Sequence, residues 1–460
     1  MDGSGGLGER MAVNGRAKFL GEDASAASIP ATNKPGRDDK DVDDVPHARD
    51  ASVAPAQLPP EIWDAVLRLR RHSHAAMAVA GSVCRAWRDI IRRQTSARAK
   101  SVPPHRMCCD DAARRGHVGV LKWLRENGAP WSTRTCSRAA NGGHLDTLQW
   151  LREQGCPWNA RTCAYAAEFG HLEVLRWAKE NGCPWDVREC SWLSAMGGHL
   201  DVIRWCEGNR PPHGTRDRRV CCNAARYGHL DILKWARANE YPWSVDTCAA
   251  AASHGDIEVL KWLRENGCPW HEETCSCAAG GNHLGVLTWA RENGCPWDAS
   301  TCSYAAGKGH IEALRWAREN GCPWNEDTCN SAASEGHIEV LKWARENGCP
   351  WDEDTCANAA GGGHMEVLKW ARERGCPWDA RTCEYAANMG ALEILKWARE
   401  NGCPWSYWTC AMAARGGHLD VLKWARENGC PWDARTYAEA IANGHTEVAG
   451  WTRDNGCPTA

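Results

Sequence analysis

Cysteine and histidine recur through most of this 460-residue sequence, in numbers that could serve metal binding. Cys136 and His144 stand eight residues apart, and similar pairs recur in almost every unit of a repeating pattern. Zinc sites need four converging ligands, usually supplied by cysteines or histidines spaced about two to five residues apart. Such close pairs do not recur, and Asp256 and Ala391 replace the histidine altogether. We therefore expect no metal site and no cofactor, and we interpret the histidines as structural.

The cysteines also lack the arrangement that nucleophilic catalysis requires. Of the 27 cysteines, twelve occupy one position of the repeating unit and ten occupy a second, in the turn sequence Gly-Cys-Pro-Trp or, at Cys457, Gly-Cys-Pro-Thr. A catalytic thiol needs its own acid or base partner, whereas twelve equivalent cysteines share no unique one. No paired carboxylates and no phosphate-binding loop stand out from the repeats. We expect that the protein is not an enzyme.

The thiols are expected to be free rather than paired. Equivalent positions in neighbouring helical repeats lie about 8–10 Å apart, whereas a disulfide needs Cα atoms within about 7 Å. Adjacent cysteines such as Cys108-Cys109 and Cys221-Cys222 could behave differently. Free thiols indicate a reducing compartment. The sequence also has no apolar run of about 18 residues that could span a membrane and no apolar signal-peptide core. We expect a cytoplasmic or nuclear protein.

The 28 tryptophans suggest aromatic cages or stacking on nucleic-acid bases. Thirteen of them, however, share one position on the longer apolar segment of the unit, and eleven follow the turn proline. Residues that recur in every copy meet the same neighbour each time, so we interpret them as packing. The net charge of −3 gives no overall attraction for nucleic acid. The basic stretch 85–106 could bind acidic partners or direct nuclear import, but it is interpreted as a solvated face and linker.

These residues belong to a unit that repeats every 27 residues from Cys109 onward, as in TCNSAASEGHIEVLKWARENGCPWDED at 328–354. A fixed period of this length indicates a solenoid. Each unit reads as two short helices. The first begins at an N-cap threonine such as Thr328 and ends at Gly336, and the second begins at His337 and ends before Pro350. Residues 207–220 lack the turn sequence, and we interpret the irregular stretch 190–220 as a kink or hinge.

The unit resembles the ankyrin repeat. The family's T-P-L-H-x-A-A segment stands here as T-C-x-x-A-A, its G-H-L-E-V-V-K-L-L-L as G-H-x-E-V-L-K-W-A-R, and its E-N-G-A-D-V-N as E-N-G-C-P-W-D. The resemblance implies an all-α, ankyrin-like solenoid of helical hairpins over residues 105–460, with about thirteen repeats. Ankyrin units run about 33 residues, and the residues missing here fall where that family projects a β-hairpin finger. The fingers are therefore expected to be shortened or absent.

Function is expected where the copies differ. The second residue after the first-helix cysteine changes from copy to copy, and so do the residues that follow Ala-Ala. In ankyrin arrays the first helix lines the concave side. The resemblance therefore implies that the variable residues form a stripe along that side, and their residue types are those that anchor protein interfaces. Drift at exposed sites is the alternative for any single residue. The candidate partner surface comprises Arg138, Tyr165, Phe169, Trp192, Tyr227, Tyr304, Tyr385 and Met412.

Two further segments precede the repeats. Residues 1–56 are rich in Gly, Ala, Ser, Asp and Pro and are predicted to be disordered. Residues 57–95 are predicted to form three short helices, too few for a large core without a partner or docking on the solenoid. Residues 96–104 are the linker to the solenoid.

The segment 57–95 resembles an F-box. That family opens with L-P-x-E-I and closes with V-C-x-x-W, and both stand here at matching separation, whereas the leucine-rich middle is replaced by RRHSHAAMAVAG. F-box helices bind a Skp-type adaptor, which connects to a cullin-type ubiquitin ligase. The resemblance therefore implies a small three-helix adaptor-binding module before the solenoid. Its candidate contact residues are Leu58, Pro59, Ile62, Trp63, Val66, Val83, Cys84 and Trp87.

Together the two resemblances imply a substrate-receptor subunit of a cullin-type ligase. Its partners would be the Skp-type adaptor with the ligase and an unknown protein target on the repeats, with no nucleic acid and no membrane. The alternative is an ankyrin-repeat scaffold without a ligase link, in which the N-terminal helices cap the array.

Overall fold

The computed structural model describes residues 104–126, 128–212 and 214–459. The tail (1–56), the F-box-like segment (57–95) and nearly all of the linker (96–104) predicted above lie outside these residues, as does the basic stretch before residue 104. The described ranges are all-α, with 26 helices arranged as thirteen consecutive pairs. An all-α solenoid of helical pairs is therefore confirmed. No helix among the described residues is both long and apolar enough to cross a bilayer.

Each pair consists of a first and a second helix. The first helices are α4 (Pro104–Arg114), α6 (Thr133–Asn141), α8 (Ala160–Glu168), α10 (Val187–Gly197), α12 (Arg219–Arg226), α14 (Val245–His254), α16 (Glu272–Gly280), α18 (Ala299–Gly307), α20 (Glu326–Ser334), α22 (Glu353–Gly361), α24 (Ala380–Asn388), α26 (Tyr407–Gly416) and α28 (Ala434–Ala442). The second helices are α5 (Val118–Glu126), α7 (Leu145–Glu153), α9 (Leu172–Glu180), α11 (Leu200–Gly208), α13 (Leu230–Ala238), α15 (Ile257–Glu265), α17 (Leu284–Glu292), α19 (Ile311–Glu319), α21 (Ile338–Glu346), α23 (Met365–Glu373), α25 (Leu392–Glu400), α27 (Leu419–Glu427) and α29 (Thr446–Asp454).

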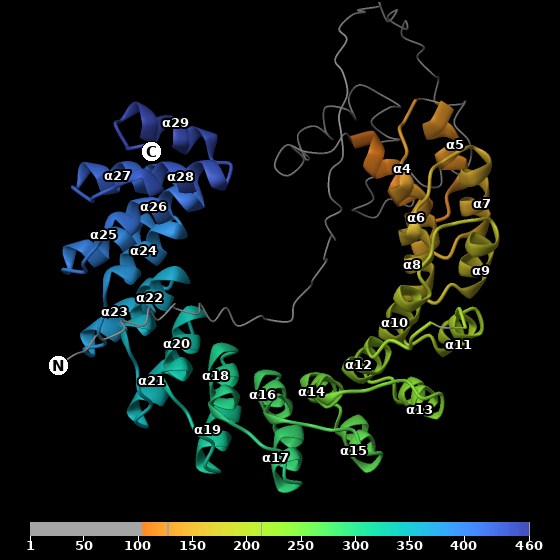
Figure 1. Cartoon of the computed structure of the whole chain (residues 1–460), viewed down its shortest axis with the longest axis horizontal. Coiled ribbons are helices and arrows are strands. Elements are labelled where there is room, and N and C mark those ends of the chain that lie inside the picture. Colours follow the sequence, from red (N-terminus) through yellow and green to blue (C-terminus); the bar gives the residue numbers. More distant parts are fainter. Residues whose placement is uncertain (1–103, 127, 213, 460) are drawn as a thin grey trace, which may run out of the picture. The chain divides into compact units, whose positions relative to one another are not determined.

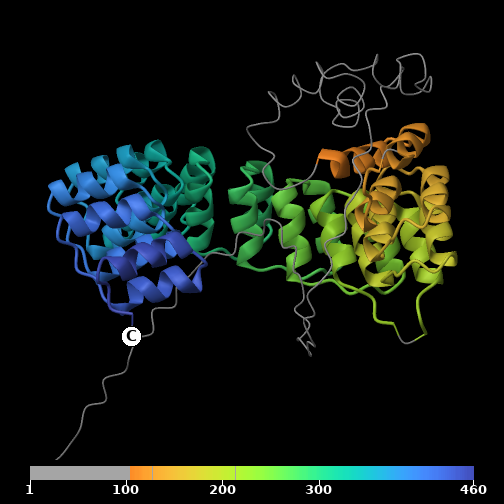
Figure 2. The ribbon, with the colours of Figure 1, turned by 90° about the horizontal axis from the view of Figure 1, so that it is seen from above.

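The helices form two rows (Figures 1 and 2). Each first helix packs against the first helices of the neighbouring pairs and against its own second helix. Second helices of neighbouring pairs touch one another far less. The chain passes from a second helix to the next first helix over short segments such as 347–352, and no strand occurs in the described ranges.

Short polar side chains at the turn start most first helices, whereas α12 and α16 begin after Arg218 and His271. In α22 the Asp352 side chain accepts a hydrogen bond from the backbone N–H of Asp354 at 3.1 Å, which satisfies one of the unpaired donors at the helix start. The prediction of a threonine N-cap is wrong, because the cap lies three residues earlier. Thr355 is fully buried and donates instead to Asn330 of the preceding repeat at 2.5 Å. The threonine thus links neighbouring first helices.

Glycine in the left-handed conformation follows the first helices, as predicted, except after α16, where Asn282 takes that conformation. Gly336 follows α20 with φ of +78°, in the left-handed region that favours glycine. A Cβ on this residue would lie 2.5 Å from Nδ1 of His364 in the next repeat. The turn therefore needs glycine for two reasons, its backbone angle and the histidine packed against it.

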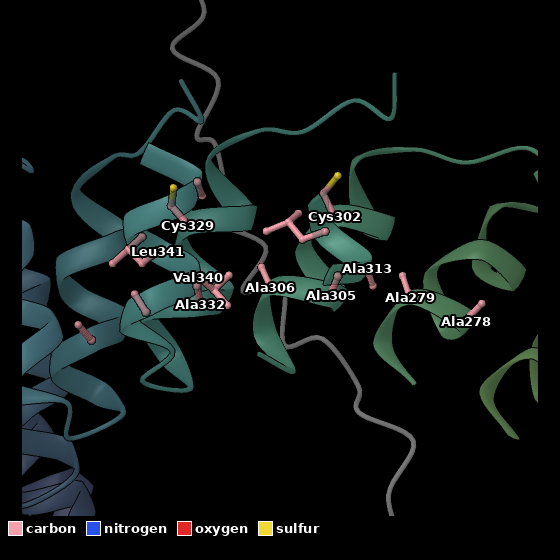
Figure 3. Packing of buried hydrophobic residues seen from close by; sticks show 14 of the residues in the cluster. Ala278, Ala279, Cys302, Ala305, Ala306, Ala313, Cys329, Ala332, Val340 and Leu341 are labelled. Carbon is pink, nitrogen blue, oxygen red and sulfur yellow. The ribbon is translucent and has the colours of Figure 1, made fainter. Parts of the chain in front are cut away.

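The core lies between the two rows and is built from small side chains (Figure 3). Cys302, Ala305 and Ala306 of α18 and Leu341 of α21 are fully buried. Small residues on the first helices allow neighbouring first helices to approach closely, while the leucines provide most of the buried apolar area. Burial of one leucine contributes about 1.5–3 kcal/mol.

The repeat containing α10 and α11 differs from the others. The segment 209–218 replaces the usual turn, and in the following repeat Tyr241 takes the turn position that cysteine fills in most repeats. Glu207 accepts hydrogen bonds from Arg210, from Arg216 at 3.0 Å and from the Tyr241 hydroxyl at 2.9 Å. The buried core also divides at α11, into one cluster on the α4 side and a second on the α29 side.

Candidate protein-binding surface

The recurring thiols are buried in pairs within each regular repeat. The Cys302 thiol of α18 hydrogen-bonds to the turn thiol of Cys322, which in turn donates to the backbone carbonyl of Asp298 at 3.3 Å. That hydrogen bond, together with burial, raises the pKa of Cys302 above its ordinary range. A thiol that stays protonated and out of contact with solvent is a poor nucleophile. No disulfide joins cysteines of the described residues.

The recurring histidines link neighbouring repeats. Nε2 of His364 lies 3.1 Å from the carbonyl oxygen of Ser334 in the preceding repeat, and His283 and His418 make equivalent contacts with Ser253 and Asn388. Their structural interpretation is therefore confirmed. Within the described ranges, no three side chains of the metal-binding types converge.

The recurring tryptophans pack in pairs at the ends of the second helices. Trp324 of a turn meets Trp343 of the following second helix edge to face, with ring centroids 6.0 Å apart. The Arg345 guanidinium lies 4.0 Å from the centre of the Trp351 ring and donates to the carbonyl of Cys349. The tryptophans are half-buried against the edge of the core rather than within it. They serve packing, as predicted, although not as fully buried core residues.

The predicted variable residues lie at equivalent positions of the first helices. Arg138, Tyr165 and Trp192 are in α6, α8 and α10, and Tyr304, Tyr385 and Met412 are in α18, α24 and α26, whereas Phe169 and Tyr227 directly follow α8 and α12. We use the name first-helix face for these equivalent positions together with the residues four before and three and four after them. Residues four apart share one side of a helix. The face therefore runs along the first-helix row.

Contacts between repeats make this face continuous. A Cβ placed on Gly280 at the end of α16 would lie 3.4 Å from the Tyr304 ring, and one placed on Gly361 would lie 3.3 Å from Cβ of Tyr385. Each tyrosine therefore packs over the end of the preceding first helix. Tyr304 remains 39% exposed.

Trp192 anchors a polar part of the face. The Arg219 guanidinium lies 5.0 Å from the centre of the Trp192 ring, and the Asn223 side-chain amide donates to the Trp192 carbonyl at 3.0 Å. Trp192 is half-buried, as are Arg138, Tyr165, Tyr385 and Met412. The structure thus brings the predicted residues into one row, with only Phe169, Tyr227 and Tyr304 strongly exposed.

Three exposed apolar residues were missing from the predicted set. Met389 follows α24 and is 57% exposed, Tyr407 begins α26, and Ile441 lies in α28. The signal for Tyr407 was available in the sequence. Tyr407-Trp408 stands where other copies have pairs such as Glu353-Asp354, so the first two positions of the first helix also vary between copies.

The chain is similar to known repeat proteins. Residues 136–178, from α6 to α9, match the family model for ankyrin repeats (many copies). Among solved structures, the chain is similar to the human ASB11 ankyrin repeat domain, with 20% identity and a TM-score of 0.30 over 35% of this chain and 84% of that one. It is also similar to the pentatricopeptide repeat protein PPR10 in complex with an 18-nt psaJ RNA element, with 15% identity and a TM-score of 0.30 over 86% of this chain and 68% of that one.

No curated protein sequence matches the chain. The match to the ankyrin-repeat family thus covers residues 136–178, and helical pairs continue on both sides of it along the described residues.

Proposed function

We propose that this chain is a non-enzymatic protein-interaction protein that binds a protein target through its first-helix face. One observation carries the proposal. All six large apolar side chains that are strongly exposed among the described residues lie on first helices or directly after them, and four of the six belong to the first-helix face: Phe169, Tyr227, Tyr304 and Met389. Exposed apolar side chains gathered on one surface are typical of a protein-binding site, and tyrosine is common among residues that dominate binding energy.

Photo-crosslinking tests this proposal directly. In the test protein, a benzophenone amino acid replaces Tyr304 on α18. In the matched control it replaces Arg315, an exposed residue on α19 of the same repeat. We expect protein adducts from position 304 and few from position 315. Equal adducts from both positions, or none from 304, would overturn the proposal.

We further propose that the chain is the substrate receptor of a cullin-type ubiquitin ligase, with residues 57–95 holding a Skp-type adaptor. The support is the sequence resemblance at Leu58, Pro59, Ile62, Val83, Cys84 and Trp87. A pull-down of the full chain with a Skp-type adaptor tests it. We expect binding by the wild type and its loss on Leu58→Ala with Trp87→Ala. No binding by the wild type would exclude the ligase link.

The second candidate is a scaffold with no ligase link, in which residues 57–95 cap the first repeat. It is supported by the small size of that segment, since three short helices need further burial. Deletion of residues 57–95 distinguishes the two. A cap predicts lower stability of the solenoid with unchanged ligase recruitment, whereas an adaptor site predicts loss of the adaptor from an equally stable solenoid.

A further inference from the structure

The first-helix face changes its charge along the array. In α6, α8, α10 and α12, the residue four positions before the variable one is arginine: Arg134, Arg161, Arg188 and Arg219. In α14, α16, α20 and α22, which form the acidic half, the same position is acidic: Asp246, Glu273, Asp327 and Asp354; arginine returns only in α24 and α28, at Arg381 and Arg435. These residues lie in the first turn, where a carboxylate stabilises a helix and an arginine does not. Helix stability therefore explains the acidic half but not the basic half.

Several arginines of the basic half, from α4 to α12, are free to bind. Arg114, Arg138, Arg161 and Arg226 make no ion pair with any described residue. Three more are paired with aspartates but keep more than half of their side chains exposed: Arg134 with Asp110, Arg188 with Asp186 and Arg219 with Asp217. The Arg188–Asp186 pair is exposed on both sides and therefore weak, so a partner carboxylate can compete for that guanidinium group.

Aromatic side chains lie among these arginines. Phe169 and Tyr227 are exposed directly after α8 and α12, and Trp192 lies beneath the Arg219 guanidinium. Asp111, which pairs with Arg115, and Glu168, whose pKa is raised by burial, are carboxylates on this part of the face. Arginine and aromatic residues together are typical of the centre of a protein interface. The surface offers both charge pairing and apolar contact.

We propose that the basic half of the first-helix face binds an acidic segment of a protein partner that carries aromatic or aliphatic anchors. The inference rests on the proposed function and assigns the partner's chemistry. Carboxylates of the segment pair with Arg138, Arg161 and Arg226, and its apolar side chains contact Phe169 and Tyr227. The acidic half repels the same segment, which fixes where along the array it binds.

A peptide fits this surface better than a nucleic acid does. Nucleic-acid binding needs a continuous basic track for the phosphates, whereas the basic first-turn positions of this face give way to acidic ones after α12. A long polyanion would also continue beside the acidic first turns of α14 to α22. A short acidic segment meets the arginines without that repulsion.

Fluorescence anisotropy with the full chain tests the proposal. The probe is a labelled peptide of about twelve residues in which glutamate alternates with leucine and tryptophan, and the comparison peptide has lysine in place of glutamate. We expect the acidic peptide to bind at least about tenfold more tightly than the lysine peptide, and more weakly as salt increases. Preference for the lysine peptide, or no difference, would overturn the proposal.

Two charge-reversed variants locate the binding site. The triple variant Arg138→Glu, Arg161→Glu and Arg226→Glu should lose at least about tenfold in affinity for the acidic peptide. The control Lys122→Glu, Arg176→Glu and Arg204→Glu makes the same net change at exposed sites of α5, α9 and α11, on the second-helix row. It should lose much less. An equal loss in both variants would contradict a specific site.

A single-stranded oligonucleotide of the same length completes the test. If it binds more tightly than the acidic peptide, the surface is a nucleic-acid site and the proposal is wrong. If no probe binds while Tyr304 still crosslinks to proteins, the acidic partner is excluded and the proposed function stands. If neither occurs, both fail.

Discussion

The buried seam between the two helix rows and the first-helix face are made by the same repeats, yet they differ in how the sequence varies. In the seam, cysteine, alanine and leucine recur at fixed positions because each copy packs against an identical neighbour. On the face, the corresponding residues include Arg138, Trp192, Tyr304 and Glu439. Recurrence therefore indicates packing in this chain, and variation from copy to copy indicates the surface on which function can be placed.

A core truncation should have the largest effect on stability. Leu341 of α21 is fully buried, so Leu341→Ala should destabilise the solenoid by about 2–5 kcal/mol. Ser331→Ala on the first-helix face of the same repeat should change stability by less than about 0.5 kcal/mol. Urea unfolding followed by circular dichroism measures both. Similar losses for the two variants would show that the face is also part of the packing.

Two glycines with the same backbone angle should differ in sensitivity. Gly336 and Gly348 both have positive φ, but a Cβ on Gly336 meets His364 while one on Gly348 meets nothing within 4 Å. Gly336→Ala should cost about 2–4 kcal/mol, and Gly348→Ala about 1–2 kcal/mol. The same urea unfolding measures the difference. Equal losses would mean that the histidine moves away at no cost and does not link the repeats tightly.

The smallest expected effect is on pH dependence. Burial lowers the pKa of His310, helped by His337, His283 and Lys308 nearby, so the folded state favours the neutral ring. Its contribution to stability is complete above the unfolded value of 6.5 and falls as the pH drops below it. When the pH is lowered from about 8 to about 5.5, the free energy of unfolding should therefore fall less for His310→Gln than for the wild type. An unchanged pH slope would contradict this assignment.

The repeat period was sufficient to predict the fold, because thirteen copies of one pattern leave little freedom in how they stack. The helix-ending Gly336 and the linking histidines were also predictable, since their roles are local. Thr355 was misassigned because a threonine before a helical pattern looks like a cap, whereas its partner Asn330 lies 25 residues away. Contacts between residues distant in sequence, such as Cys302 with Cys322, need the three-dimensional arrangement.

The candidate surface was predicted in part. Variation identified the positions of Tyr165, Tyr304 and Tyr385, but their exposure depends on what each covers in the preceding repeat. Tyr304 and Tyr385 both pack over a glycine of the preceding first helix, yet only Tyr304 is strongly exposed, and Trp192 is half-buried beneath Arg219. The charge change along the face was present in the sequence. It indicates a binding surface only once the first turns of the first helices are known to lie on the same face as the variable residues.

Proximity labelling tests most directly whether function lies on the first-helix face. The full chain is compared with a Tyr165→Ala, Tyr304→Ala, Tyr385→Ala variant and with a control, Lys342→Ala, Lys369→Ala, Lys396→Ala, on the second helices α21, α23 and α25. We predict that the tyrosine variant loses proteins that the wild type and the control both label, at unchanged stability. Retention of the same proteins by the tyrosine variant, or their loss from the control, would contradict the account.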